Sequence, residues 1–223
     1  MLDLIALCDG VRAEIEHLVN ASDTEILFVE DQEQLDKILE LRGRLPKLRR
    51  VIVFDPRGTG GVTDYGLLSF EALLARGRAV AEAQAAEIAL RQGRIAAHDT
   101  AMMVFTSGST GLPKAAMISH ANLSAAADYA REIFGGFPPG TNILSYLPLC
   151  HIAEQNVTVT NALAGQMVMN FGESLRTIRL DLRDVAPEIF FGVPRIWEKT
   201  QAEIGVQAAT AGRIRRPLTL KAL

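Results

Sequence analysis

Short apolar runs alternate with amphipathic segments along the first part of the chain. The amphipathic segments repeat apolar residues every three or four positions, which is typical of helices. The apolar runs are rich in Val, Ile and Phe and are closed by acidic residues, proline or glycine, which is typical of buried strands. The predicted elements are a helix over 11–22, a strand over 25–31, a helix over 31–45 and a strand over 49–58. This order predicts an α/β fold, a layered parallel sheet with crossover helices.

The alternation continues through the rest of the chain. The glycines between Thr59 and Tyr65 predict a loop, and the alanine-rich stretch over 69–95 predicts a helix with a break near Gly77. A strand is expected over 101–105, followed by a helix over 122–136 that is capped by Asn122 and stopped by Gly135 and Gly136. Later expected elements are a strand over 142–149, a helix over 156–163, a strand over 165–171, and strand and helix pieces over 181–204 split by Pro187 and Pro194.

Composition narrows the class of protein. The chain has 223 residues, of which 48% are hydrophobic and 22% charged, as in ordinary soluble globular proteins. It carries 23 Lys and Arg against 26 Asp and Glu, which argues against a dedicated nucleic-acid binder. Cys8 and Cys150 fit no zinc or disulfide pattern, so a reducing cytoplasm is the expected location. The N-terminus does not resemble a signal peptide and no apolar run could cross a bilayer, so we expect a soluble or peripheral protein.

Residues 106–114, TSGSTGLPK, have the composition of an anion-binding loop. Gly108 and Gly111 permit close approach of backbone N–H groups, the hydroxyl side chains add donors, and Lys114 adds positive charge. The stretch lies between a predicted strand and a predicted helix. It is not a Walker A loop, because no lysine follows Gly111 directly, and it lacks the full GxGxxG fingerprint. On residue chemistry alone, a polyphosphate cradle and an ordinary flexible turn are equally supported.

Three stretches in order resemble motifs of one superfamily. TSGSTGLPKAAMISH (106–120) is similar to the phosphate loop of the adenylate-forming enzymes, and YLPLCHIAE (146–154) is similar to their next core motif. FGVPRIWEK (191–199) resembles a segment of the long-chain fatty acyl-CoA synthetase branch. The resemblance implies that residues 1–210 form part of the N-terminal domain of that fold, that 211–223 is a basic tail, and that the C-terminal lid domain is absent. The later YGxTE and TGD motifs are not found, so we expect an internal fragment.

The resemblance also implies a reaction and a set of site residues. In such enzymes ATP activates a fatty acid as an acyl-adenylate, Mg2+ neutralises phosphate charge, and coenzyme A then displaces AMP. The residues matching the phosphate loop are Thr106, Ser107, Gly108, Ser109, Thr110, Gly111 and Lys114. His151 matches a group beside the acyl carboxylate and the α-phosphate, and Trp197 matches an aromatic gate of the acyl tunnel. No metal ligand is assigned within the chain.

Structural explanations stand beside these roles. His151 could be a plain capping or core histidine, Trp197 could be core, and Glu154 could simply favour the helix dipole. His17, His98 and Cys8 have no partner pattern, and we expect them to be structural or exposed. Where the superfamily usually has glycine after the loop lysine, this chain has Ala115.

Two hypotheses follow from the sequence. In the first, the chain is part of a long-chain fatty acid–CoA ligase, inactive alone, with further sequence or a partner chain supplying the missing motifs. In the second, it is a non-catalytic remnant that binds nucleotide or a partner. An acyl-lipid substrate is compatible with loose contact to a membrane surface.

Overall fold

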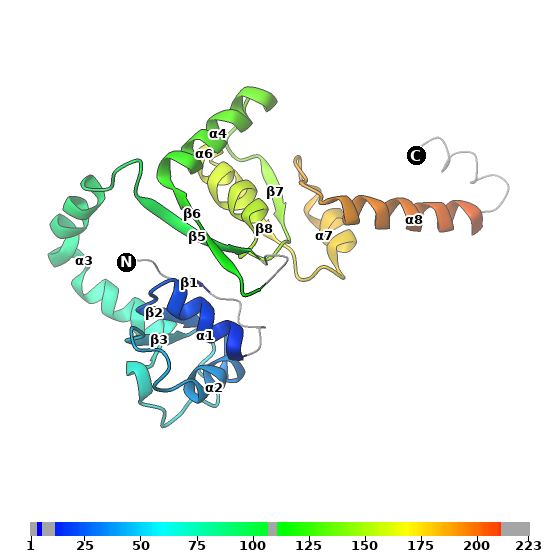
Figure 1. Cartoon of the computed structure of the whole chain (residues 1–223). Helices are drawn as coiled ribbons and strands as arrows, with labels where there is room; N and C mark the ends of the chain where they lie inside the picture. The colour runs from blue at the N-terminus through cyan, green and yellow to red at the C-terminus, as the bar shows by residue number, and fades with distance from the viewer. Residues whose placement is uncertain (1–3, 6–11, 107–110, 211–223) are drawn as a thin grey trace. The chain divides into compact units, whose positions relative to one another are not determined.

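The computed structural model describes residues 4–5, 12–106 and 111–210. These residues divide into two units, and Figure 1 labels most of the helices and strands of both. The first unit extends from the N-terminus to Phe137 and includes Leu147–Gly165, and the second comprises Pro138–Tyr146 and the chain from Gln166 onward. The predicted tail over 211–223 and the loop residues 107–110 lie outside the described residues.

A parallel sheet opens the first unit. Its order is β1-β2-β3-β4, and every neighbouring pair is parallel. The strands are β1 (Leu4–Ile5), β2 (Ile26–Val29), β3 (Arg50–Val53) and β4 (Leu68–Ser69). Helix α1 (Arg12–Ala21) connects β1 to β2, and α2 (Gln32–Glu40) connects β2 to β3. The α/β prediction is therefore confirmed here. The elements α1, β2, α2 and β3 are each shorter than their predicted ranges, and the short strands β1 and β4 were not predicted.

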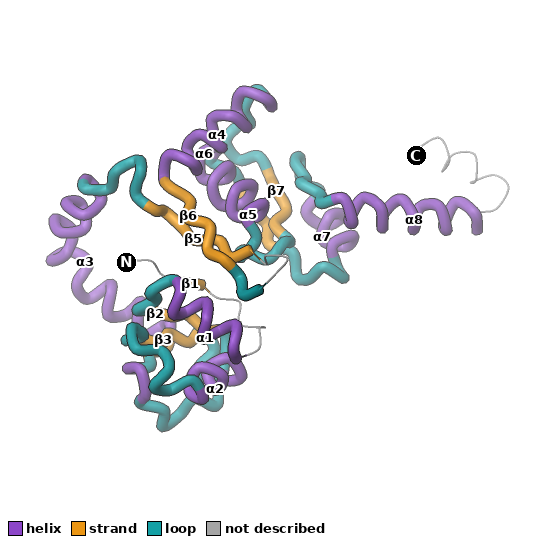
Figure 2. The backbone as a smooth tube through the Cα atoms, viewed as in Figure 1, coloured by secondary structure: helices purple, strands orange, loops and turns teal. Residues whose placement is uncertain are grey.

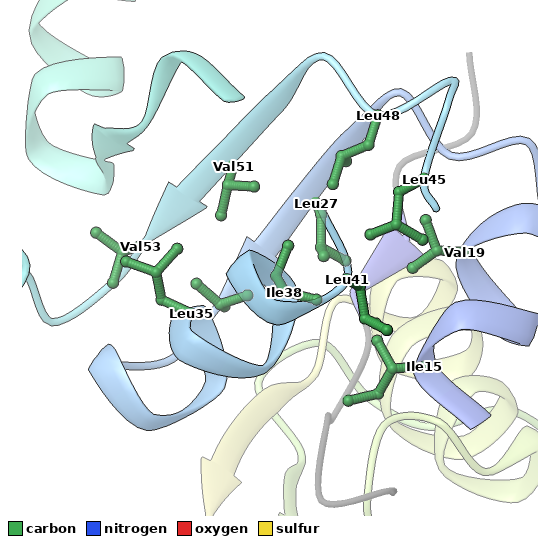
Figure 3. Packing of buried hydrophobic residues seen from close by; sticks show 11 residues of the cluster. Ile15, Val19, Leu27, Leu35, Ile38, Leu41, Leu45, Leu48, Val51 and Val53 are labelled. Atoms are coloured by element: carbon green, nitrogen blue, oxygen red, sulfur yellow. The ribbon is translucent and has the colours of Figure 1, made fainter. Parts of the chain in front are cut away.

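The core of this unit lies between the sheet and the two helices (Figure 3). Successive side chains of a strand point to opposite faces, so Leu27 and Val29 of β2 face the helices while Phe28 faces away. The cluster consists of Ile15, Val19, Leu27, Val29, Leu35, Ile38, Leu41, Leu45, Leu48, Val51 and Val53. On the other face, the ring of Phe54 lies 6.0 Å from Phe28 and 4.9 Å from Phe70.

Helix α3 (Phe70–Gly93) follows β4 and is capped by the Ser69 hydroxyl, which accepts from the Ala72 N–H. The predicted break at Gly77 is wrong, because the helix runs unbroken through this residue. Glycine weakens a helix by about 1 kcal/mol relative to alanine but removes no backbone hydrogen bond, and strong helix formers surround it here. None of the residues of α3 is buried.

A hairpin continues the first unit. Strands β5 (Thr100–Thr106) and β6 (Lys114–Ser119) pair in antiparallel fashion, so the element after the loop is a strand and not the expected helix. Helix α4 (His120–Phe134) begins only after β6. Its N-cap is Ser119 instead of Asn122, which serves as the third helical residue of a capping box. The predicted stop is confirmed, since Gly135 ends α4 with φ +73°.

The last part of the first unit is one helical stretch of changing pitch (Figure 2). It comprises α5 (Ile152–Glu154), a π-helical segment (Gln155–Asn161) and α6 (Ala162–Gly165). This confirms the helix predicted over 156–163. The π-helical segment packs against α4, and π-helical turns of this kind are often found at functional sites.

The second unit contains a parallel pair, β7 (Asn142–Ser145) and β8 (Val168–Phe171), as expected for these two ranges. Ile189 adds an isolated parallel bridge to Ile143. Two helices follow, α7 (Ile178–Val185) and α8 (Pro194–Thr210). Pro194 splits the region as predicted and occupies the first helical position, where proline leaves no hydrogen bond unmade.

Candidate functional site

The ends of the TSGSTGLPK stretch are brought together by the hairpin. Thr106, the last residue of β5, pairs with Lys114, the first residue of β6. Ser107, Gly108, Ser109 and Thr110 lie outside the described residues. Gly111 has φ +149°, a backbone conformation that favours glycine. The loop is followed by strand β6 and not by a helix, so no helix N-terminus supplies backbone N–H groups to an anion at this place.

Lys114 is exposed and forms no ion pair with any residue of the described ranges. A lysine that pairs with no carboxylate keeps its three N–H donors available for an anion. The next residue, Ala115, pairs with Phe105 in the regular ladder and is not among the residues with positive φ. This position therefore makes no demand for glycine, and the departure from the superfamily pattern costs the hairpin nothing.

His151 is the N-cap of α5, and its tautomer follows from its contacts. Its Nδ1 accepts a hydrogen bond from the Ala153 N–H at 3.1 Å. A neutral imidazole whose Nδ1 accepts carries its proton on Nε2. The residue is exposed, so Nε2–H can donate to an oxyanion. In this arrangement the ring is a hydrogen-bond donor and not a base.

Two neighbouring side chains fasten the turn in front of His151. Glu154 is 3% exposed and accepts from the Leu147 N–H at 3.3 Å and from the Thr158 hydroxyl. The Gln155 amide donates to the Leu149 carbonyl at 2.6 Å. From the sequence, Glu154 was expected only to interact favourably with the helix dipole, and its burial was not predicted.

Trp197 lies in the second unit and is held by its own neighbourhood. Its Nε1–H donates to the Gly192 carbonyl at 2.8 Å, and its ring meets the Phe190 ring edge-on at 5.6 Å. Phe190 in turn packs on Tyr146 at 5.3 Å. A Cβ at position 192 would lie 2.4 Å from Trp197 Nε1, so the indole requires glycine there. The gate role of Trp197 stays a prediction, and His151 belongs to the other unit.

An open groove of about 380 Å³ lies in the first unit between β5, α4, the π-helical segment and α6. Its apolar lining includes Met102, Leu123 and Leu163. At its polar side Arg131 forms an ion pair with Asp128 at 3.3 Å. This mixture of apolar and charged groups suits an amphipathic molecule but does not single out one ligand.

Within residues 12–106 and 111–210, no group of three His, Cys, Asp or Glu side chains could hold a metal ion. Mg2+ that accompanies ATP is usually held by one or two carboxylates together with the phosphates, so it does not require such a cluster. Cys150 is a free, exposed thiol. None of the described helices combines the length and apolar character needed to cross a bilayer.

One loop contact was missed by the sequence analysis. His17 of α1 hydrogen-bonds through Nε2 to the carbonyl of Pro113 at 2.7 Å. The two residues are 96 positions apart, so no local pattern could connect them. His98, by contrast, is exposed as expected and lies 3.9 Å from Asp99.

The chain is similar in sequence to several proteins named long-chain-fatty-acid–CoA ligases. The chain is 31% identical over 216 residues to the long-chain-fatty-acid–CoA ligase heimdall of Drosophila melanogaster, and it covers 31% of that protein. It is also 31% identical to the long-chain-fatty-acid–CoA ligase ACSBG2 of Rattus norvegicus, over 94% of this chain and 32% of that protein. The chain thus spans about a third of the length of these relatives.

Solved structures support the fold. The A-PCP didomain of carboxylic acid reductase from Segniliparus rugosus matches 92% of this chain and 30% of its own, with a TM-score of 0.67 and 22% identity. ATP-bound MatB from Rhodopseudomonas palustris matches 89% of this chain and 35% of its own, with a TM-score of 0.62 and 20% identity. The family described as AMP-binding enzyme matches residues 10–219. Since that match spans nearly the whole sequence, this chain belongs to the AMP-binding enzyme family.

Proposed function

We propose that this chain is the phosphate-binding part of an ATP-dependent long-chain fatty acid–CoA ligase. The observation that carries the proposal is the hairpin that joins Thr106 to Lys114 at the base of a hydroxyl- and glycine-rich loop, with the lysine exposed and without an ion-pair partner in the described ranges. Membership of the AMP-binding enzyme family and the names of the two ligase relatives support the reaction and the acyl class.

The proposed reaction has two displacements. A carboxylate oxygen of the fatty acid attacks the α-phosphorus of ATP, the bond to the bridging oxygen breaks, and pyrophosphate leaves. The thiol of coenzyme A, as thiolate, then attacks the acyl carbonyl, and AMP leaves with the bonding electron pair. Both steps develop negative charge on oxygen, and fixed hydrogen-bond donors and cations lower such barriers.

The residues have separate roles in this proposal. Thr106, Ser107, Gly108, Ser109, Thr110 and Gly111 would hold the β- and γ-phosphates through hydroxyl and backbone donors. Lys114 would balance the charge of the pyrophosphate leaving group. His151 would donate from Nε2 to the acyl carboxylate or the α-phosphate, because its Nδ1 already accepts from Ala153. None of these groups needs to transfer a proton.

A titration tests the central claim. Binding of MgATP to the chain should weaken about 10- to 100-fold in Lys114→Ala, because hydrogen bonds to charged groups contribute about 1.5 to 3 kcal/mol. Lys199→Ala is the matched control, since Lys199 lies on α8 and has no role in the proposal. Binding of a long-chain fatty acid should be unchanged in both variants. An equal loss of fatty-acid and ATP binding in Lys114→Ala would contradict the assignment.

A second candidate function is nucleotide or partner binding without catalysis. This function needs only the loop and Lys114 at the base of the hairpin, and it makes no demand for the YGxTE and TGD motifs. Fatty-acid-dependent exchange between ATP and pyrophosphate separates the two functions. Exchange is expected when a continuation or partner chain supplies the later motifs, and its absence there would leave only the binding function.

The same proposal extends to location. A cytoplasmic protein that acts on fatty acids meets them at a membrane surface, so peripheral contact is expected to be weak and reversible. Sedimentation with phosphatidylcholine vesicles, with and without oleate, tests this. Binding that does not respond to oleate would argue against a substrate-linked contact.

A further inference from the structure

The contact between His17 and Pro113 ties the first helix of the fold to the end of the phosphate loop. The distance between His17 Nε2 and the Pro113 carbonyl oxygen is 2.7 Å. A carbonyl oxygen only accepts, so the imidazole must donate and must carry a proton on Nε2. This geometry makes the contact a directed hydrogen bond and not a chance approach of two polar groups.

His17 is presented from a rigid support. It lies in the middle of α1. Ile15, two positions before it, and Val19, two positions after it, are each only 2% exposed and lie in the core against the sheet (Figure 3). Ion pairs from Arg12 to Glu40 and from Glu16 to Arg44 add further links from α1 to α2 and the segment after it. The imidazole itself is half-buried.

Pro113 stands at the point where the loop becomes β6. Its carbonyl belongs to the peptide group that leads into Lys114, the first residue of the strand. Pairing of Thr106 with Lys114 holds the base of the loop, and the bond from His17 fixes the plane of the peptide just before the lysine. Leu112, one residue earlier, is 55% exposed and gives little packing support. Among the described residues, the His17 imidazole thus supplies a side-chain hydrogen bond that holds the backbone between Gly111 and Lys114.

We propose that His17 is a positioning residue for Lys114: it holds the Pro113–Lys114 peptide so that the lysine is in place before nucleotide binds. This inference rests on the proposed function and adds a residue to it. His17 itself does not touch phosphate. Holding a binding residue in place in advance reduces the conformational entropy that is lost on binding, which raises affinity.

The test compares His17→Ala, His17→Gln and His98→Ala. Glutamine keeps an N–H donor at nearly the reach of Nε2, and His98 is an exposed histidine far from this contact in sequence. Binding of MgATP is measured by calorimetry, and amide hydrogen exchange is measured in peptides that cover 111–119. Because one hydrogen bond of this kind has a modest net effect, His17→Ala should weaken MgATP binding about three- to tenfold.

The expected pattern is faster exchange over 111–119 and weaker MgATP binding in His17→Ala, partial recovery of both in His17→Gln, and no change in His98→Ala. Thermal unfolding of all variants shows whether the fold around α1 is retained. If His17→Ala does not fold, the comparison of wild type with His17→Gln still tests the inference. Unchanged exchange in His17→Ala overturns the inference, and so does faster exchange with unchanged affinity. A wild-type chain that binds no MgATP would instead overturn the proposed function, which separates the two failures.

Discussion

The β1–β4 sheet with α1 and α2, and the β5–β6 hairpin with α4, belong to one unit but are built differently. The sheet region holds the whole main cluster of buried apolar side chains. In the described residues of β5, β6 and α4, Val104 is the one buried hydrophobic residue, while Met117, Tyr129 and Phe134 are each at least 65% exposed. The described ends of the candidate phosphate loop, Thr106 and Lys114, lie in the sparsely packed region. The Lys114 side chain is thus available for a ligand, and the packed region can stabilise the fold without it.

This difference implies that stability and binding can be changed separately. Core side chains contribute mainly through burial, which is proportional to the apolar area removed from water. An exposed lysine or threonine contributes little to folding but can contribute much to the binding of an anion. Four predictions test how sharp this division is, beginning with the largest effect.

Leu27→Ala should destabilise the chain by about 3 to 5 kcal/mol, because the side chain is fully buried and leaves a cavity. In the hairpin region, Met117→Ala in β6, whose side chain is 67% exposed, should change stability by no more than about 0.5 kcal/mol. Urea unfolding followed by circular dichroism measures both. Equal losses at the two positions would remove the contrast between the two regions.

Gly192→Ala should destabilise the second unit by about 1 to 3 kcal/mol, because its Cβ would overlap the Trp197 indole, 2.4 Å from Nε1. Trp197 is the only tryptophan, so its fluorescence reports the displacement directly. Gly205→Ala is the control, since nothing lies within 4 Å of its Cβ position. An unshifted emission spectrum in Gly192→Ala would mean that the indole is not held as described.

Gly77→Ala should stabilise α3 by about 0.5 to 1 kcal/mol, because alanine is the better helix former and its Cβ meets nothing within 4 Å. The helix is unbroken and lacks buried residues, so propensity is expected to dominate there. Slower amide exchange across the middle of α3 would be the signature. A loss of helicity would instead indicate that α3 bends at position 77 in a way that only glycine allows.

The smallest change in stability is expected from substitution of Glu188, and this change should depend on pH. Hydrogen bonds from its own backbone N–H and from the Asn142 N–H, at 2.7 Å, hold the pKa of the Glu188 carboxyl below its usual 4.5. A lowered pKa in the folded state means that the stabilisation is present above pH 4.5 and disappears as pH falls through the lowered value. Glu188→Gln should therefore melt slightly below wild type at pH 7, with the difference shrinking as pH falls below 4.5. A difference that stays constant as the pH is lowered through the acidic range would contradict this linkage.

Local patterns predicted the two helices and the two longer strands of the sheet region. The apolar spacing of α1 and α2 and the Val- and Ile-rich runs of β2 and β3 each indicate the element that forms there, whereas the two-residue strands β1 and β4 are too short for such a pattern. The hairpin was predicted less well. AAMIS after Lys114 alternates too weakly to distinguish a strand from a helix start, and Ser119 with Asn122 places the helix cap only once the strand is known.

The candidate site shows the same limit. The loop composition and the lysine were visible in the sequence, and so was the family resemblance that the match over residues 10–219 bears out. The tautomer of His151, the burial of Glu154 and the indole–glycine contact at Trp197 depend on geometry that composition does not carry. Ser107, Gly108, Ser109 and Thr110 remain predictions from the motif.

By itself, the sequence determined the α/β class, the order of most elements and the chemistry offered by TSGSTGLPK. Periodicity and residue type act over a few positions, and these features need nothing more. Only the tertiary structure decided that the loop closes a hairpin, with Thr106 opposite Lys114, and that His17 reaches Pro113 from 96 residues away. Such contacts are set by how packed elements bring distant segments together, and no local pattern records that arrangement.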